Sequence, residues 1–350
     1  MLIPLRTRLA LGAALWLLTF ASPAEAELKA IWGPTTLADG RSAFPIYRDL
    51  GVEVLQRQLS WRAVAIRRPA RARNPSDRAY RWPAELDATM AAASASGIRI
   101  ALMVKETPRW AGGGPQGSRA PRDVADYARF LRAASRRYPA VRHWMIWGEP
   151  TRMGSFAPMP KNRRRGPRAY ASLLDAAYGA LKRESKRNIV IGGMTYTIGE
   201  VLPADFLRWM RLPGGRRPRL DWYGHNPYSV RFPDLSQDPY VPGLRDFSDI
   251  DTLARELRRA YPAQRPRLWL SEFSISSDRA NRALSFFLSR AEQARWLTAA
   301  FRIAHAHRYV AGLGWYSLLD EIGRPGSLTT GLMTADAQPK PAYQAYKRAP

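Results

Sequence analysis

The chain has 350 residues, of which 46% are hydrophobic, and a formal net charge of +26 at pH 7. It contains no cysteine, which excludes disulfide bonds, thiol chemistry and a lipid anchored on cysteine. Such a charge suggests a nucleic acid, an anionic lipid or an acidic polymer as partner. However, 48 of the 55 basic residues are arginine, and they are scattered along the chain, which indicates a bias towards arginine codons as much as a selected partner.

The first residues predict export rather than a folded element. Two early arginines precede the apolar run Leu9–Phe20, and Ala24–Ala26 fits a small-x-small cleavage site. The run is shorter than the roughly 20 residues that span a bilayer, so a cleaved signal is favoured over an N-terminal anchor. We expect a secretory signal peptide over residues 1–26, cleaved after Ala26 in a secreted protein, and one catalytic domain over residues 27–350. No later segment is apolar enough to span a membrane.

Beyond this point, short apolar runs alternate with longer stretches of helical periodicity, which is typical of βα units in a parallel sheet. Strands are predicted, in chain order, at Lys29–Trp32, Val52–Gln58, Ile98–Val104, His143–Trp147, Asn188–Met194, Leu220–Asn226, Arg267–Ser271 and Ala311–Ser317. Helices are predicted after them at Ala43–Leu50, Ala84–Ser96, Val124–Tyr138, Arg168–Lys186, Ala204–Met210, Ile250–Tyr261, Ser285–Ala306 and Pro341–Lys347.

Eight strands in alternation with eight helices predict an α/β fold, the single-domain (β/α)₈ TIM barrel. A doubly wound open sheet is the alternative, and it would normally show a phosphate-binding glycine-rich turn after an early strand. The first strand ends instead in Trp32-Gly33-Pro34. Long irregular stretches at 63–80, 151–166 and 231–247 are expected to shape a cleft.

Two carboxylates follow apolar strands in the same way. Glu149 ends the sequence HWMIWGEP, in which Gly148 and Pro150 stop the fourth strand, and Glu272 ends the seventh strand within LWLSEFS. Strands four and seven lie on opposite sides of an eight-membered ring, so the two acids can face each other across its mouth. A facing pair of carboxylates is what glycoside hydrolysis requires. Glu106 and Glu321 also follow strands, and we expect them to form loop salt bridges.

The paired motifs WMIWGEP and LWLSEFS resemble the signature strands of the retaining glycoside hydrolases of clan A, and are most similar to the cellulase-like family 5 and the xylosidase-like family 39. Shorter similarities extend over most of the chain, at Gly51 with Arg57 and Trp61, at Thr107–Trp110, at His225–Ser229, at Trp315 and at Lys340–Tyr343. The resemblance implies that Glu149 is the general acid/base and Glu272 the nucleophile, with carboxyls about 5–5.5 Å apart. It implies no cofactor.

The resemblance also implies roles for residues around the two acids. Tyr228 would donate its hydroxyl to the nucleophile. Arg57 is expected to pair with a catalytic carboxylate or, alternatively, to form a structural ion pair. The apolar neighbours of Glu149 would keep it protonated near neutral pH, whereas Glu272 would stay ionised. Trp315 would form the floor under the reacting sugar, because flat sugar faces stack on indoles. Further platform candidates are Trp32, Trp61, Trp110 and Trp147.

One position departs from the pattern of these families. The asparagine that usually precedes the acid/base, and that holds the 2-hydroxyl of the sugar, is Gly148 here. Either Asn226 or His225 takes over its contact, or the substrate lacks this contact, or the barrel is a weak or retired enzyme. The main hypothesis is therefore a secreted, monomeric retaining β-glycosidase that cleaves a polysaccharide or oligosaccharide.

A second hypothesis is a catalytically poor barrel that binds an acidic glycan at the cell envelope, which the net charge and the many tryptophans favour. A third hypothesis is a membrane or nucleic-acid binder, and only the net charge supports it. We expect neither binding of nucleic acid nor stable insertion into a membrane. Four scattered histidines and no cysteine predict no metal site.

Overall fold

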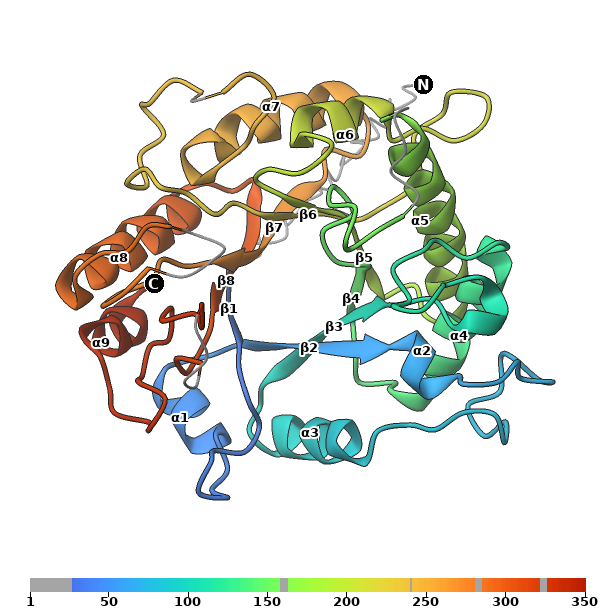
Figure 1. Cartoon of the computed structure of the whole chain (residues 1–350), viewed down its shortest axis with the longest axis horizontal. Helices are drawn as coiled ribbons and strands as arrows, with labels where there is room; N and C mark the ends of the chain where they lie inside the picture. Colours follow the sequence, from blue (N-terminus) through green and yellow to red (C-terminus); the bar gives the residue numbers. More distant parts are fainter. Residues whose placement is uncertain (1–26, 158–162, 240, 281–284, 322–325) are drawn as a thin grey trace, which may run out of the picture.

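The computed structural model describes residues 27–157, 163–239, 241–280, 285–321 and 326–350. The predicted signal peptide lies outside them. Eight parallel strands form a closed barrel in which each strand pairs with its neighbours in chain order and the last pairs with the first (Figure 1). The strands are β1 Leu28–Trp32, β2 Val54–Ser60, β3 Arg99–Lys105, β4 His143–Ile146, β5 Ile189–Tyr196, β6 Trp222–Asn226, β7 Arg267–Phe273 and β8 Val310–Tyr316. This confirms the predicted (β/α)₈ barrel.

Helices surround the barrel on its outside (Figure 1). They are α1 Phe44–Asp49, α2 Trp61–Val64, α3 Ala84–Ala95, α4 Val124–Arg137, α5 Arg165–Glu184, α6 Pro203–Trp209, α7 Ile250–Ala260, α8 Arg290–Ala306 and α9 Pro341–Arg348, with short 3₁₀ turns at Arg109–Ala111 and Phe247–Asp249. None of the helices within the described ranges combines the length and the apolar character needed to cross a bilayer.

Two helices differ from the sequence prediction. The turn α2 occupies a stretch that we expected to be irregular, and it begins because the Ser60 hydroxyl accepts the Ala63 amide. Helix α8 begins later than predicted, because Ser289 and Glu292 each accept the other's backbone amide in a capping box. The cap, rather than the apolar pattern, sets where the helix starts.

The barrel interior contains aliphatic and methionine side chains and the stacked rings of Trp222 and Trp269, together with a buried polar bridge. Gln56 on β2 donates to the carbonyl of Ser271 on β7 at 2.7 Å, and its amide oxygen accepts from Trp269 at 3.1 Å and from the Ser271 hydroxyl at 3.0 Å. Every polar atom of the Gln56 amide therefore has a partner, as a buried group requires. This bridge, which we call the Gln56 bridge, ties β2 to β7 across the interior.

A β-bulge in β7 lies directly beside this bridge. The register with β8 runs from Leu270 opposite Leu313 to Phe273 opposite Trp315, so β7 contains one extra residue. Leu270 and Phe273 both pack in the core outside the barrel, whereas Ser271 bonds to Gln56 inside it. The bulge therefore interrupts the usual alternation of faces, and it turns Glu272 towards the mouth of the barrel, where it meets Tyr228.

Candidate active site

Glu149 and Glu272 lie at the same end of the barrel, at the carboxyl ends of β4 and β7. Glu149 follows a sharp turn in which Trp147 and Glu149 adopt positive φ angles of 68° and 49°. Such angles are uncommon for residues with a side chain and cluster at functional sites. The Glu149 amide donates to the carbonyl of Met194 on β5 at 2.9 Å, so the neighbouring strand holds this turn in place.

The Glu149 carboxylate is held by two neighbouring donors. Arg152, three residues later, forms an ion pair with it at 2.7 Å. The Nδ2 of Asn226, at the end of β6, lies 3.4 Å from the other carboxylate oxygen. The Arg152 guanidinium in turn lies 5.0 Å from the ring centre of Tyr196. The side chain of Glu149 is 18% exposed, so solvent can reach it.

Glu272 accepts a hydrogen bond from the Tyr228 hydroxyl at 3.1 Å, the partner that the resemblance implies. Burial and then the negative charge of Glu149 raise the pKa of Glu272 to about 8, although the Tyr228 bond and the charges of Lys105 and Arg152 oppose this rise. The charge of Glu149 thus acts directly on the Glu272 carboxyl. We expected Glu272 to be ionised near neutral pH, and burial in the unliganded protein acts against this by raising its pKa.

Three tyrosines and one tryptophan surround the pair. The rings of Tyr196 and Tyr228 lie 5.5 Å apart, and Trp32 and Tyr316, paired across β1 and β8, lie 6.5 Å apart. Burial raises the pKa of Tyr196 and of Tyr316 to about 12, with further contributions first from Glu149 for Tyr196 and from Glu272 for Tyr316. Trp32 also donates to the carbonyl of Ser271 at 3.0 Å. Trp32 thus lies beside Tyr316 at the barrel mouth, and its role as a sugar platform stays a prediction.

The space beside Gly148 is filled. A Cβ atom at Gly148 would lie 2.5 Å from the sulfur of Met103 and 3.9 Å from the Cδ of Lys105. An asparagine at this position would therefore have to displace the Met103 side chain. Lys105, the last residue of β3, makes no hydrogen bond or ion pair within the described part of the chain, and its charge lowers the pKa of Glu272.

Three of the predicted platforms are core residues instead. Trp61, Trp147 and Trp315 are fully buried. Trp315 donates to the carbonyl of Thr330 and packs on Phe273 outside the barrel. Trp315 is buried in the core because side chains alternate along β8, and this alternation turns Trp315 towards the helices. The next residue, Tyr316, lies at the mouth.

Trp61 and Trp147 lie in the same outer layer. Trp61 stacks on Phe130 at 5.7 Å between ring centres. The ring of Trp147 packs on Phe156, and its indole nitrogen donates to the carbonyl of Ser155 at 2.8 Å. Neither ring reaches the two carboxylates.

Arg57 and Trp110 also lie away from the acids. Arg57 pairs with Glu85 of α3 at 2.6 Å rather than with a catalytic carboxylate, because the alternation of β2 turns it outward, on the side opposite to Gln56. Trp110 donates to the carbonyl of Ala65, and the guanidinium of Arg68 covers its ring at 4.9 Å. Its indole is thus used in packing the loops after β2 and β3.

Of the two candidates for the missing asparagine, only Asn226 has a free polar atom. His225 is fully buried, and its ring nitrogens are taken up by Thr195 and by the carbonyl of Arg245 at 2.8 Å. Burial also lowers the pKa of His225 to about 4. Asn226 is buried beside Glu149, and its Oδ1 has no hydrogen-bond partner among the described residues.

Four residues of the site escaped the sequence analysis. Three of them end a strand, as Lys105 ends β3, Tyr196 ends β5 and Tyr316 ends β8. The rule that located the glutamates, that functional side chains follow barrel strands, would have found these three. The fourth, Arg152, lies in a loop, and no pattern marked it.

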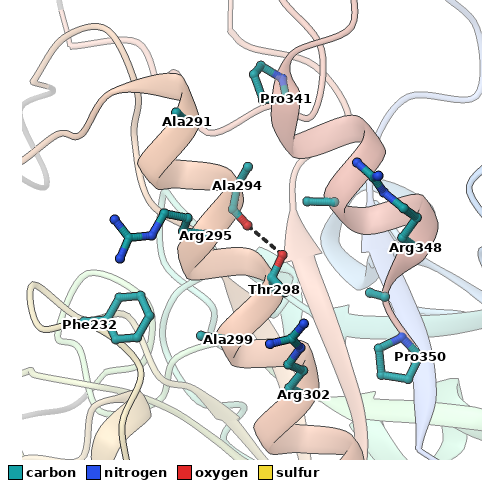
Figure 2. A pocket seen from close by; sticks show the side chains of 12 residues that line it. Phe232, Ala291, Ala294, Arg295, Thr298, Ala299, Arg302, Pro341, Arg348 and Pro350 are labelled. Carbon is teal, nitrogen blue, oxygen red and sulfur yellow. Dashed lines mark hydrogen bonds between the residues drawn. The ribbon is translucent and has the colours of Figure 1, made fainter.

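Other depressions lie away from the strand ends. Figure 2 shows a groove of about 710 Å³ on the outer layer between α8 and α9, with Arg295, Arg302 and Arg348 at its edges. The Thr298 hydroxyl in this groove bonds to the carbonyl of Ala294 on its own helix. Among the described residues that line this groove, none has a carboxylate side chain. Within the described ranges, no cluster of three or more histidines and acids is arranged to hold a metal ion.

Comparisons with known proteins show similarity at the level of structure. No protein-family model matches the chain, and no curated protein matches it in sequence. Among solved structures, a family 39 glycoside hydrolase from the gut symbiont Bacteroides cellulosilyticus WH2 is similar with a TM-score of 0.69 and 19% identity, over 93% of this chain and 63% of that one. A glucosidase from Croceicoccus marinus follows with a TM-score of 0.66 and 18% identity, over 92% and 66%.

The family 39 enzyme from Xanthomonas axonopodis pv. citri is similar with a TM-score of 0.64 and 18% identity, over 92% of this chain and 65% of that one. The chain thus spans about two thirds of the length of each of these structures. The fold is therefore that of the clan A glycoside hydrolases, of the family 39 type, as the sequence motifs led us to expect.

Proposed function

We propose that the chain is a retaining glycoside hydrolase for β-glycosidic bonds, with Glu272 as nucleophile and Glu149 as general acid/base. The observation that carries the proposal is the interacting pair of carboxyls at the ends of β4 and β7, with the Tyr228 hydroxyl 3.1 Å from Glu272. The similarity to family 39 structures supports it. Each step of double displacement uses both of these groups.

In the first step, the carboxylate of Glu272 attacks the anomeric carbon while Glu149 protonates the departing oxygen. Water deprotonated by Glu149 then releases the sugar from the glycosyl-enzyme. Double displacement needs the Glu272 carboxyl ionised, whereas burial raises its pKa to about 8 in the unliganded protein. Substrate binding therefore has to favour the ionised form of Glu272. The Tyr228 hydrogen bond stabilises the Glu272 anion that attacks.

Asn226 substitutes for the asparagine missing at position 148. Its Nδ2 lies 3.4 Å from Glu149, and its Oδ1 is buried without a partner among the residues described. A buried acceptor without a donor is costly, and a sugar 2-hydroxyl beside Glu149 would supply the donor. Trp32 and Tyr316 provide the floor of the sugar site in place of Trp315.

The test is replacement of the nucleophile. Glu272→Gly is expected to lower kcat by about 10⁴-fold or more, and sodium azide is expected to restore turnover with a glycosyl azide whose anomeric configuration is opposite to that of the substrate. Glu321→Gln, which removes another carboxylate at the same end of the barrel, serves as a matched control and should retain activity. Unchanged activity of the Glu272→Gly variant would refute the proposal.

A second candidate function is binding of an acidic glycan without turnover. The observation in its favour is the unpartnered Lys105 beside Gly148, together with Arg152 at the same mouth. This function predicts that Glu149→Gln and Glu272→Gln variants bind an acidic oligosaccharide as tightly as the wild type, with an affinity that falls as salt rises. Calorimetric titrations at two salt concentrations decide between the functions.

We further propose that residues 1–26 are removed on secretion and that the remaining chain is a monomer. N-terminal sequencing of protein from the culture medium should begin at Glu27. Light scattering coupled to size exclusion should give the mass of a single chain.

A further inference from the structure

A small pocket of about 150 Å³ opens beside the catalytic pair, between the loops that follow β5 and β6. Tyr196 and Tyr228 form the wall nearest the carboxylates, and Ile198, Val230 and Leu244 form the rest of the apolar lining. Tyr228 links the pocket directly to the chemistry, because its hydroxyl bonds to Glu272. The mechanism above assigns no role to this space.

The polar side chains around the pocket are already satisfied. The hydroxyl of Thr197 donates to the carbonyl of Tyr228 at 2.8 Å. The hydroxyl of Ser229 donates to Asp246 at 3.1 Å, and Arg231 pairs with the same carboxylate at 2.7 Å. These groups therefore offer little to a polar ligand, and the pocket presents hydrocarbon and ring surface.

Two large aliphatic side chains at this pocket face water. Ile198 is 54% exposed and Val230 is 50% exposed. Burying such side chains gains about 1.5–3 kcal/mol each, so adjacent aliphatic residues exposed beside a reaction centre are typical of a ligand-binding surface. A ligand that covers both would realise this gain.

The Tyr196 wall of the pocket adjoins the ion pair of Glu149 and Arg152. Glu149 protonates the departing oxygen, so the leaving group lies on the Glu149 side of the sugar. Among charged groups, Glu149 contributes most to the raised pKa of Tyr196, and the Arg152 that pairs with Glu149 lies over the Tyr196 ring. The Tyr196 wall thus connects the general acid to the pocket.

The volume of the pocket fits one aromatic ring, because an apolar cavity of about 150 Å³ is known to accommodate benzene. We infer that this pocket takes an aromatic ring on the leaving group of the substrate, so that the preferred substrates are aryl or arylalkyl β-glycosides. The inference rests on the proposed function and adds the chemistry of the leaving group to it.

The test compares benzyl and methyl β-glycosides of the sugar that the enzyme hydrolyses. The two alcohols are similar in acidity, so the comparison reports contact with the ring rather than leaving-group ability. The wild type is expected to favour the benzyl glycoside by about 10- to 100-fold in kcat/KM. Val230→Asp should raise KM for the benzyl glycoside by about 10-fold and change kcat/KM for the methyl glycoside by less than twofold.

The control variant is Val241→Asp. Val241 lies in the same loop region, is 38% exposed and carries the same change, but it does not line the pocket. It should leave both rates unchanged. A benzyl-to-methyl ratio near one in the wild type, or the same ratio in wild type and Val230→Asp, would overturn the inference while the glycosidase function stands.

A second measurement keeps the two proposals separable. Saturation-transfer NMR with benzyl alcohol as the probe should show binding to the wild type and to Val241→Asp and loss of binding in Val230→Asp. If no glycoside is hydrolysed but this pattern holds, the glycosidase proposal fails and the aromatic pocket stands. If benzyl alcohol binds all three proteins alike, the assignment of the pocket fails.

Discussion

Arg152 forms an ion pair with Glu149, the proposed general acid. A guanidinium at 2.7 Å favours the ionised form of the carboxylate that it contacts. At the same time burial and the charge of Glu149 raise the pKa of Glu272 to about 8. The raised pKa of Glu272 should therefore appear in the pH dependence of the proposed hydrolysis.

The first prediction concerns the alkaline limb of the pH profile. The active pair must carry one proton, and this last proton leaves with the pKa of Glu272, about 8. We therefore expect kcat/KM to fall as pH rises through about 8, because no general acid remains above it. The measurement is kcat/KM between pH 5 and pH 10 in buffers of constant ionic strength. A profile that stays level to pH 10 would contradict the charge state described for the pair.

The second prediction is that the charge of Arg152 lowers the pH at which kcat/KM falls. The charge of Arg152 lowers the pKa of Glu272, so Arg152→Met should move the alkaline limb to higher pH, by about half a unit to one unit. The matched control is Arg208→Met, which removes another arginine that pairs with an acid three residues away, Asp205, on α6. A limb that shifts equally in both variants would mean that only the net charge of the protein matters.

The third prediction concerns stability. The folded pKa of Glu272 lies above its ordinary value of 4.5, so the stabilisation from its protonated form is fully present below pH 4.5 and is lost as pH rises through about 8. Glu272→Gln, which stays neutral, should therefore raise Tm by about 2–8 °C at pH 8 and by much less at pH 4.5. Differential scanning calorimetry at the two pH values measures the difference. Glu321→Gln should show no such gain.

The fourth prediction tests Asn226 as the residue that contacts the 2-hydroxyl. Asn226→Ala should lower kcat/KM for an ordinary glycoside by about 10- to 100-fold, because a contact that strengthens in the transition state is lost. The same substitution should have little effect on the 2-deoxy glycoside, which lacks that hydroxyl. An equal loss with both substrates would instead indicate that Asn226 only positions Glu149.

The strand pattern was enough to predict the barrel, because each βα unit contributes one apolar run and one helical period. It also placed Glu149 and Glu272 at the same end of the barrel, since the carboxyl ends of all parallel strands meet there. The pattern did not show which face each side chain takes. Trp315 and Tyr316 differ by one position, and that single step decides between the core and the mouth.

Local irregularities limited the rest of the prediction. Strict alternation from Leu270, which faces the helices, would put Glu272 on the same outer side, and only the bulge in β7 turns it to the mouth. Met103 fills the space next to Gly148 through a contact between two strands far apart in sequence. The ion pair of Arg152 depends on the path of a loop. None of these three features has a periodic signature in the sequence.

The Gln56 bridge holds the β7 backbone next to Glu272 independently of the loops that line the pocket beside it. Gln56 bonds to the carbonyl and the hydroxyl of Ser271, the residue before Glu272, from inside the barrel. These contacts involve no loop at the mouth. Gly314 keeps this space open, because a Cβ there would lie 2.2 Å from the Gln56 nitrogen. The loops after β5 and β6, apart from Tyr196 and Tyr228, can therefore be redesigned to change the accepted leaving group, while the position of Glu272, the proposed nucleophile, is preserved.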